Sequence, residues 1–216
     1  MKTIFTFLFL SLCCAGIRLT AQNYYSETKT FHENGYTYQC DVNEASMVSL
    51  YNASCTYYKT AQIDLSTGKR YEYIPGKPPL AREARTKPQC FAIVNRAFPS
   101  EFKARINGRE LTIVLYIEST TGKIVDVVFN FTTGKLATAY TQVPVSVYRE
   151  IEVELKKSVR FTPSAVGKNL SYIFMFWTQD PNVTIQNAPL KPLEPVEPDL
   201  PDDESPRDDR GPIVVE

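Results

Sequence analysis

Few residues in this sequence are of types that could carry out chemistry. The chain has five cysteines and one histidine, His32, so a nucleophile such as Cys90 would have a single imidazole available as its base. The sequence contains no Cys-x-x-Cys pair that would indicate a zinc site. It also contains no glycine-rich phosphate loop that would indicate a nucleotide site. We therefore expect no enzyme, no cofactor and no metal. A pair of facing carboxylates among the 24 acidic residues remains the one alternative route to a hydrolase.

The first 21 residues are typical of a secretory signal peptide. A basic residue precedes the apolar run Ile4–Ile17, and the small Ala21 stands at the expected cleavage site. The run is shorter than the ~20 residues of a membrane span, so we expect a secreted or periplasmic protein with no span in the mature chain. Two alternatives stay open: an uncleaved anchor, and an outer-membrane lipoprotein acylated at Cys13 or Cys14.

Three cysteines lie beyond this leader, and in an oxidising compartment they can form one internal disulfide at most. Cys40 and Cys55 belong to the same strand-rich segment, so we predict that pair among the three pairings. Cys90 would then be a buried thiol in a helix.

Tyrosine is the other unusual feature, because nine of the 13 tyrosines lie between residues 24 and 73. A tyrosine ring suits a half-buried pleated sheet, and its wet hydroxyl also suits a surface that binds glycans or peptides. As candidates for binding a glycan or envelope polymer we take Tyr36, Tyr38, Tyr57 and Tyr58.

Residues 22–74 must position those tyrosines, and their alternating pattern predicts an antiparallel β meander. The turn at 32–35 predicts a hairpin. The strands that we expect are Glu27–Phe31, Tyr36–Val42, Met47–Tyr51, Thr56–Leu65 and Lys69–Ile74. A proline-rich basic connector, residues 75–88, then marks a boundary.

Residues 89–186 show both helical and strand periodicity, so the fold class expected for the chain is α+β. The predicted elements are helix Gln89–Phe98, strands Glu110–Glu118 and Lys123–Phe131, helix Pro144–Ser158 and strand Leu170–Trp177. On the second helix we interpret Glu150, Glu152 and Glu154 as a solvated face, with Glu152 paired to Lys156 outside the core.

The order strand, Gly122 turn, strand, helix, Phe161-Thr162-Pro163, Gly167 and strand resembles the carboxy-terminal domain of the TonB family over residues 105–177. The resemblance implies a β-β-α-β unit whose strand after the helix accepts an extended peptide at its edge. It makes Leu170, Tyr172 and Phe174 candidate partner-binding residues. Energy transduction is not implied, because a tyrosine-rich β region replaces the proline-rich spacer of that family. The whole chain also resembles small secreted bacterial proteins of unknown function.

The last segment, residues 187–216, is rich in proline and acids and is expected to be disordered. From position 189 onward it holds nine acidic and three basic residues, although the whole chain is neutral with 24 of each. Neither part is basic enough for nucleic-acid binding. We therefore expect a non-enzymatic protein that binds an extended peptide or envelope protein, and alternatively a glycan.

Overall fold

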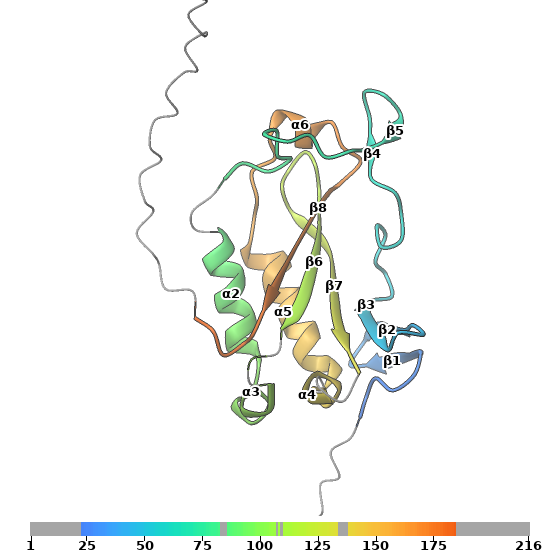
Figure 1. Ribbon diagram of the computed structural model, residues 1–216, viewed down its shortest axis with the longest axis vertical. Coiled ribbons are helices and arrows are strands. Elements are labelled where there is room, and N and C mark those ends of the chain that lie inside the picture. The colour runs from blue at the N-terminus through green and yellow to red at the C-terminus, as the bar shows by residue number, and fades with distance from the viewer. Residues whose placement is uncertain (1–22, 83–85, 107, 109, 134–137, 185–216) are drawn as a thin grey trace, which may run out of the picture. The chain divides into compact units, whose positions relative to one another are not determined.

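The computed structural model describes residues 23–82, 86–106, 108, 110–133 and 138–184 (Figure 1). The predicted leader and the predicted disordered tail lie outside these residues. The described part belongs to a single compact unit. The predicted β region, residues 22–74, and the predicted second domain, residues 89–186, share that unit.

A six-stranded antiparallel sheet forms the centre of the fold, in the order β1-β2-β3-β7-β6-β8. The strands are β1 (Lys29–Glu33), β2 (Tyr36–Val42), β3 (Met47–Asn52), β6 (Leu111–Ile117), β7 (Ile124–Thr132) and β8 (Ile173–Gln179). Because β3 pairs with β7, the amino-terminal meander continues the sheet of the second half. The α+β class with a mostly antiparallel sheet is therefore confirmed.

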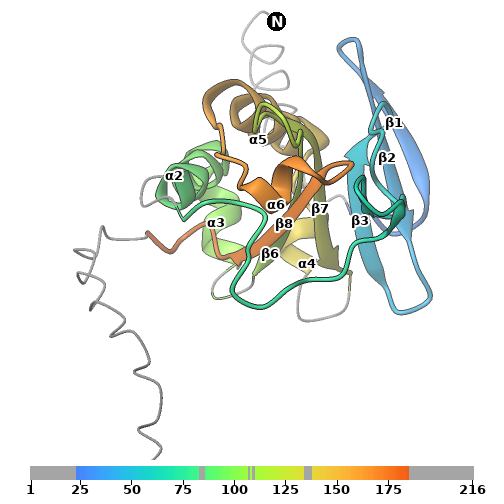
Figure 2. The same ribbon diagram turned by 90° about the horizontal axis from the view of Figure 1, so that it is seen from above.

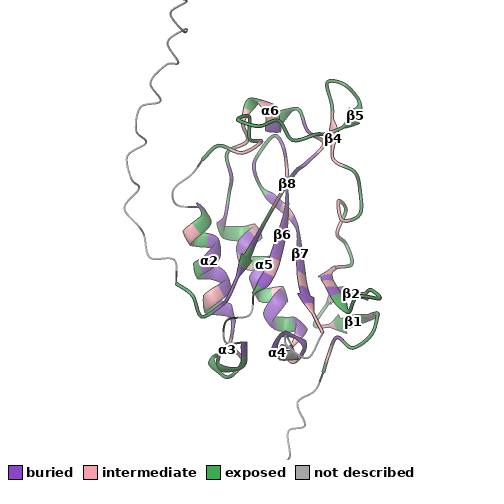
Figure 3. Ribbon diagram, viewed as in Figure 1, coloured by how far each residue is buried: buried purple, intermediate pink, exposed green. Residues whose placement is uncertain are grey.

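The long helices α2 (Thr86–Ala97) and α5 (Val145–Ser158) cover one face of this sheet (Figure 2). The shorter helices are α3 (Ser100–Ile106), α4 (Thr138–Thr141) and α6 (Ala165–Lys168). The two long helices, α2 and α5, pack against each other, and α5 packs on β7. Most residues of β6 and β7 are buried, whereas β8 alternates between more buried and more exposed positions (Figure 3).

The segment after β3 differs from the predicted meander. Only β4 (Ile63–Asp64) and β5 (Lys69–Arg70) form, as a separate two-stranded hairpin. The buried carboxylate of Asp126 on β7 accepts the N–H groups of Thr56 at 2.8 Å and Tyr57 at 3.0 Å. These side-chain bonds replace a strand ladder, so the chain crosses the outer face of the sheet as a loop. The strand predicted at 56–65 is wrong for this reason.

Glu152 on α5 does not lie on a solvated face as predicted, because its side chain is fully buried. Its carboxylate accepts hydrogen bonds from the Tyr38 hydroxyl, from Arg149 Nη1 at 2.9 Å and from Lys156 Nζ at 2.6 Å. Tyr38 comes from β2, which covers this side of the helix. The helix pattern alone does not reveal that a second element lies over a face of charged residues.

The glycine turn and the Phe-x-Pro segment meet in space. Gly122 has φ +71°, and a Cβ placed there would lie 1.7 Å from the carbonyl oxygen of Phe161. The Phe161 N–H donates to the Gly122 carbonyl at 2.9 Å. Only glycine allows this close backbone approach with a positive φ.

Candidate functional site

Strand β8 forms one edge of the sheet and hydrogen-bonds to β6 on one side only. The backbone of Ile173–Gln179 makes no other backbone hydrogen bond to any residue that the structure describes. The opposite edge of the sheet is β1, which pairs with β2.

The direction of each backbone group on β8 follows from the ladder. The Glu118 N–H donates to the Lys123 carbonyl across the β6–β7 hairpin, so even-numbered β6 residues point toward β7. Odd-numbered β6 residues therefore bond to β8, where Ile117 faces Ile173. The outward N–H and C=O groups on β8 belong to Phe174, Phe176 and Thr178.

The beginning of the predicted binding strand, residues 170–172, is already covered by β4. The Ser171 N–H donates to the Ile63 carbonyl at 2.8 Å, and Gln62 Nε2 donates to the Tyr172 carbonyl at 2.6 Å. Leu170 and Tyr172 are buried, with 1% and 4% of their surface exposed. These two residues, predicted to contact a peptide, are instead packed inside the protein. The free edge begins at residue 173.

Of the three residues predicted to contact a peptide on this strand, Phe174 is exposed, at 43%. Phe176, two residues further along β8 and not among the predicted binding residues, is exposed at 61%. The two rings lie 5.9 Å apart on the outer face, away from the helices. Trp177 points the other way and is stacked on Phe91 of α2. The run of five apolar residues hid this alternation, since it contains no polar residue to mark a face.

Two hollows flank β8, one on each face of the sheet. The outer hollow has a volume of about 320 Å³ and is lined by Lys59, Gln62, Arg70, Tyr116, Tyr172 and Phe174, among others. The inner hollow has a volume of about 110 Å³ and is lined by Lys87, Cys90, Phe161, Met175, Phe176 and Trp177. Both hollows are lined in part by β8 residues.

The four candidate tyrosines do not form one surface. Tyr38 is fully buried and donates its hydroxyl to Glu152, and Tyr36 donates to Glu33 at 3.0 Å on the same, helix-facing side. Tyr57 and Tyr58 are half-buried on the outer face. There Tyr57 lies over Tyr116, with ring centres 6.4 Å apart and ring planes 18° apart.

The predicted disulfide is also wrong, because the structure has Cys40, Cys55 and Cys90 as free thiols. Cys40 is buried in the core on the helix side of the sheet, whereas Cys55 packs in the cluster on the outer face. The sheet itself separates the two sulfurs. Burial raises the pKa of Cys40 to about 11 and the pKa of Cys55 and of Cys90 to about 12, so these thiols are poor nucleophiles.

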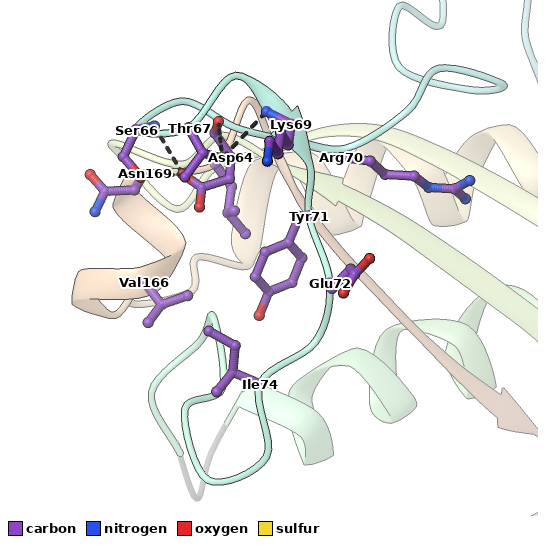
Figure 4. Close-up of a pocket in the computed structure, with 11 residues that line it drawn as sticks. Asp64, Ser66, Thr67, Lys69, Arg70, Tyr71, Glu72, Ile74, Val166 and Asn169 are labelled. Carbon is purple, nitrogen blue, oxygen red and sulfur yellow. Dashed lines mark hydrogen bonds between the residues drawn. The ribbon is translucent and has the colours of Figure 1, made fainter.

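A wider hollow of about 670 Å³ lies beside the β4–β5 hairpin (Figure 4). Its two acids do not face each other, since Glu72 lies on the far side of Tyr71 from Asp64 (Figure 4). The Asp64 carboxylate accepts hydrogen bonds from the Ser66 N–H at 2.9 Å and the Ser66 hydroxyl at 2.6 Å. The hydrogen bond from the Ser66 side chain lowers the pKa of Asp64, so this carboxylate serves to close the turn.

Among the described residues, no group of three or more His, Cys, Asp or Glu side chains is arranged to hold a metal ion. The same part of the chain contains no helix long and apolar enough to cross a membrane.

The fold and the edge define a class: an α+β protein whose six-stranded antiparallel sheet has helices on one face, aromatic residues on the other and an open edge strand. The sequence matches the family described as a domain of unknown function, DUF5043, over residues 21–177, and the chain belongs to that family. A crystal structure of a DUF5043 family protein from Bacteroides uniformis ATCC 8492 is similar, with a TM-score of 0.70 and 36% identity. The match covers 74% of this chain and 89% of that chain. No curated protein matches. The resemblance to small bacterial proteins of unknown function is thereby confirmed.

Proposed function

We propose that the protein is a secreted or periplasmic, non-enzymatic binding protein that takes up an extended peptide by strand addition at β8. The observation that carries the proposal is the free backbone of Phe174, Phe176 and Thr178 at the edge of the sheet. An added strand would satisfy these groups with main-chain hydrogen bonds.

The contrast between the two edges of the sheet supports this choice. Exposed edges are usually protected by charged residues or proline. The edge β1 carries Lys29, His32 and Glu33, whereas β8, with the sequence IFMFWTQ, carries no charge and no proline. An unprotected apolar edge is expected where another strand binds.

The hollows on either side of β8 add to the argument. Side chains of an extended peptide alternate between the two faces of a sheet. A peptide on β8 would therefore direct alternate side chains toward the outer and the inner hollow. The order β6, β7, α5, β8 also agrees with the order of elements in the TonB resemblance, whose mode of recognition is of this kind.

Glycan binding by the tyrosine-rich region has less support. A flat surface for binding sugars needs exposed aromatic rings that are nearly coplanar. Among the residues that the structure describes, Tyr73 is the one tyrosine that is largely exposed. Tyr51 and Tyr58 are tilted by 49° to each other, and Tyr57 and Tyr172 by 40°.

Substitution of Phe176 separates backbone recognition from side-chain recognition. Phe176→Pro removes an outward N–H and leaves the ladder with β6 intact, whereas Phe176→Ala keeps that N–H and removes the ring. We expect nine-residue peptides selected from a randomised phage library to bind the wild type, to bind Phe176→Ala several-fold more weakly, and to lose binding to Phe176→Pro.

Met175→Pro is the folding control, because its missing N–H belongs to the internal ladder and should destabilise the protein. Matching thermal melts of the wild type and Phe176→Pro would show that the edge variant is folded. Selected peptides that bind folded Phe176→Pro as well as they bind the wild type would refute strand addition at β8, and so would a library that yields no binder.

A further inference from the structure

We propose that the outer hollow beside β8 selects an acidic side chain of the bound peptide, and that the inner hollow takes a small apolar side chain an odd number of residues away. This inference rests on the proposed function and names the class of peptide.

The charged residues that line the outer hollow are both basic. Lys59 and Arg70 line it, and none of its lining residues is acidic. Lys59 is already paired with Asp41 at 2.6 Å. Arg70 has no ion pair or hydrogen-bonded acceptor among the described residues, so its guanidinium is the cation available to a ligand. Guanidinium groups bind carboxylates through two parallel N–H bonds.

The walls of the hollow are held in place before any ligand arrives. The Tyr172 hydroxyl donates to the Thr60 carbonyl at 2.7 Å, and Gln62 Nε2 donates to the Tyr172 carbonyl at 2.6 Å. The Ile63–Arg70 pairing of β4 with β5 fixes the backbone that carries the guanidinium. A preordered pocket loses less entropy on binding, which favours selection of one side-chain type.

The register of β8 links the two hollows. Phe174 lines the outer hollow, and Met175, Phe176 and Trp177 line the inner one. Of these three, Met175 and Trp177 point to the helix side of the sheet. Because successive side chains of a strand point to opposite faces, a peptide residue beside Phe174 and one beside Met175 or Trp177 are separated by one or three positions. The inner hollow is mostly apolar and, at about 110 Å³, small, so it suits a side chain such as valine.

Three blocked peptides test the inference directly: Thr-Val-Thr-Val-Glu-Val-Thr-Val-Thr and its versions with Gln or Lys at the centre. We expect the Glu peptide to bind the full mature chain about fivefold more tightly than the Gln peptide, with the Lys peptide weakest. The advantage of Glu over Gln should decrease in 0.5 M salt, at which exposed charges are screened. Fluorescence anisotropy with labelled peptides measures all three affinities.

Arg70→Gln and Lys69→Gln form a matched pair, because they are neighbours on β5 and lose the same charge. Lys69 lines the hollow by the β4–β5 hairpin and not the outer hollow beside β8. The Arg70→Gln variant should bind the Glu peptide and the Gln peptide equally well. The Lys69→Gln variant should still prefer the Glu peptide.

The outcomes separate the two proposals. Equal affinity for the Glu and Gln peptides, with binding still lost in folded Phe176→Pro, would overturn the acidic preference and leave strand addition standing. Binding that Phe176→Pro does not weaken would overturn strand addition. Failure of all three peptides to bind at millimolar concentration would overturn the stated peptide class, and the library selection would then decide on strand addition by itself.

Discussion

Removal of the Glu152 carboxylate should destabilise the protein far more than removal of an ordinary surface charge. Glu152→Ala leaves the buried Tyr38 hydroxyl without its acceptor, which costs about 1–3 kcal/mol. Arg149 and Lys156 also lose their partner, but about a third of each side chain is exposed and can turn to water. Their contribution is therefore about 1 kcal/mol or less for each. The expected loss in free energy of unfolding is about 3 kcal/mol.

Glu154→Ala is the matched control on the same helix. Glu154 is 32% exposed and lies 3.6 Å from Arg96, so its removal should cost about 0.5 kcal/mol or less. Urea unfolding can be followed by the fluorescence of Trp177, which is the only tryptophan and is mostly buried. Equal losses for Glu152→Ala and Glu154→Ala would refute the buried role of Glu152.

The same residue sets a pH dependence of stability. Burial raises the pKa of Glu152, but hydrogen bonds from Lys156, Tyr38 and Arg149 outweigh it, so the pKa lies below its ordinary value. A carboxylate with a lowered pKa stabilises the fold above its unfolded pKa of about 4.3, and this contribution is lost as the pH falls through the folded pKa. The stability difference between wild type and Glu152→Gln should therefore be larger at pH 6 than at pH 3. A difference that does not change with pH would contradict the lowered pKa.

Three further outcomes are expected. Gly122→Ala should lower the melting temperature strongly, since its Cβ would overlap the Phe161 carbonyl; Gly35→Ala, also at positive φ but with no atom within 4 Å, should cost less. The thiols of Cys40, Cys55 and Cys90 should react slowly with iodoacetamide at pH 8 in the folded protein and fully in urea, because burial raises their pKa to about 11–12. Mass spectrometry of the exported protein should show cleavage after Ala21, and an acylated cysteine at the new amino terminus would contradict that site.

The sequence alone determined the elements whose pattern is local. The alternation along Leu111–Ile117 and Ile124–Thr132 and the apolar stripe of Val145–Ser158 led to strands and a helix close to those observed. These predictions succeeded because a buried face leaves a period of two or 3.6 residues in the chain itself. The hairpin of β1 and β2 was found for the same reason, helped by its glycine turn.

The tertiary structure decided which surfaces meet. The pairing of β3 with β7 joins residues about 80 positions apart, and no local pattern specifies it. In the complete sheet β8 pairs with β6 alone and lies at an edge, Cys40 and Cys55 lie on opposite faces, and Glu152 is buried beneath Tyr38. The helix pattern predicts a solvated face for Glu152 until a distant strand is known to cover it, and the apolar run of β8 does not show which side of the strand is open. Both depend on contacts that the chain makes only after it has folded.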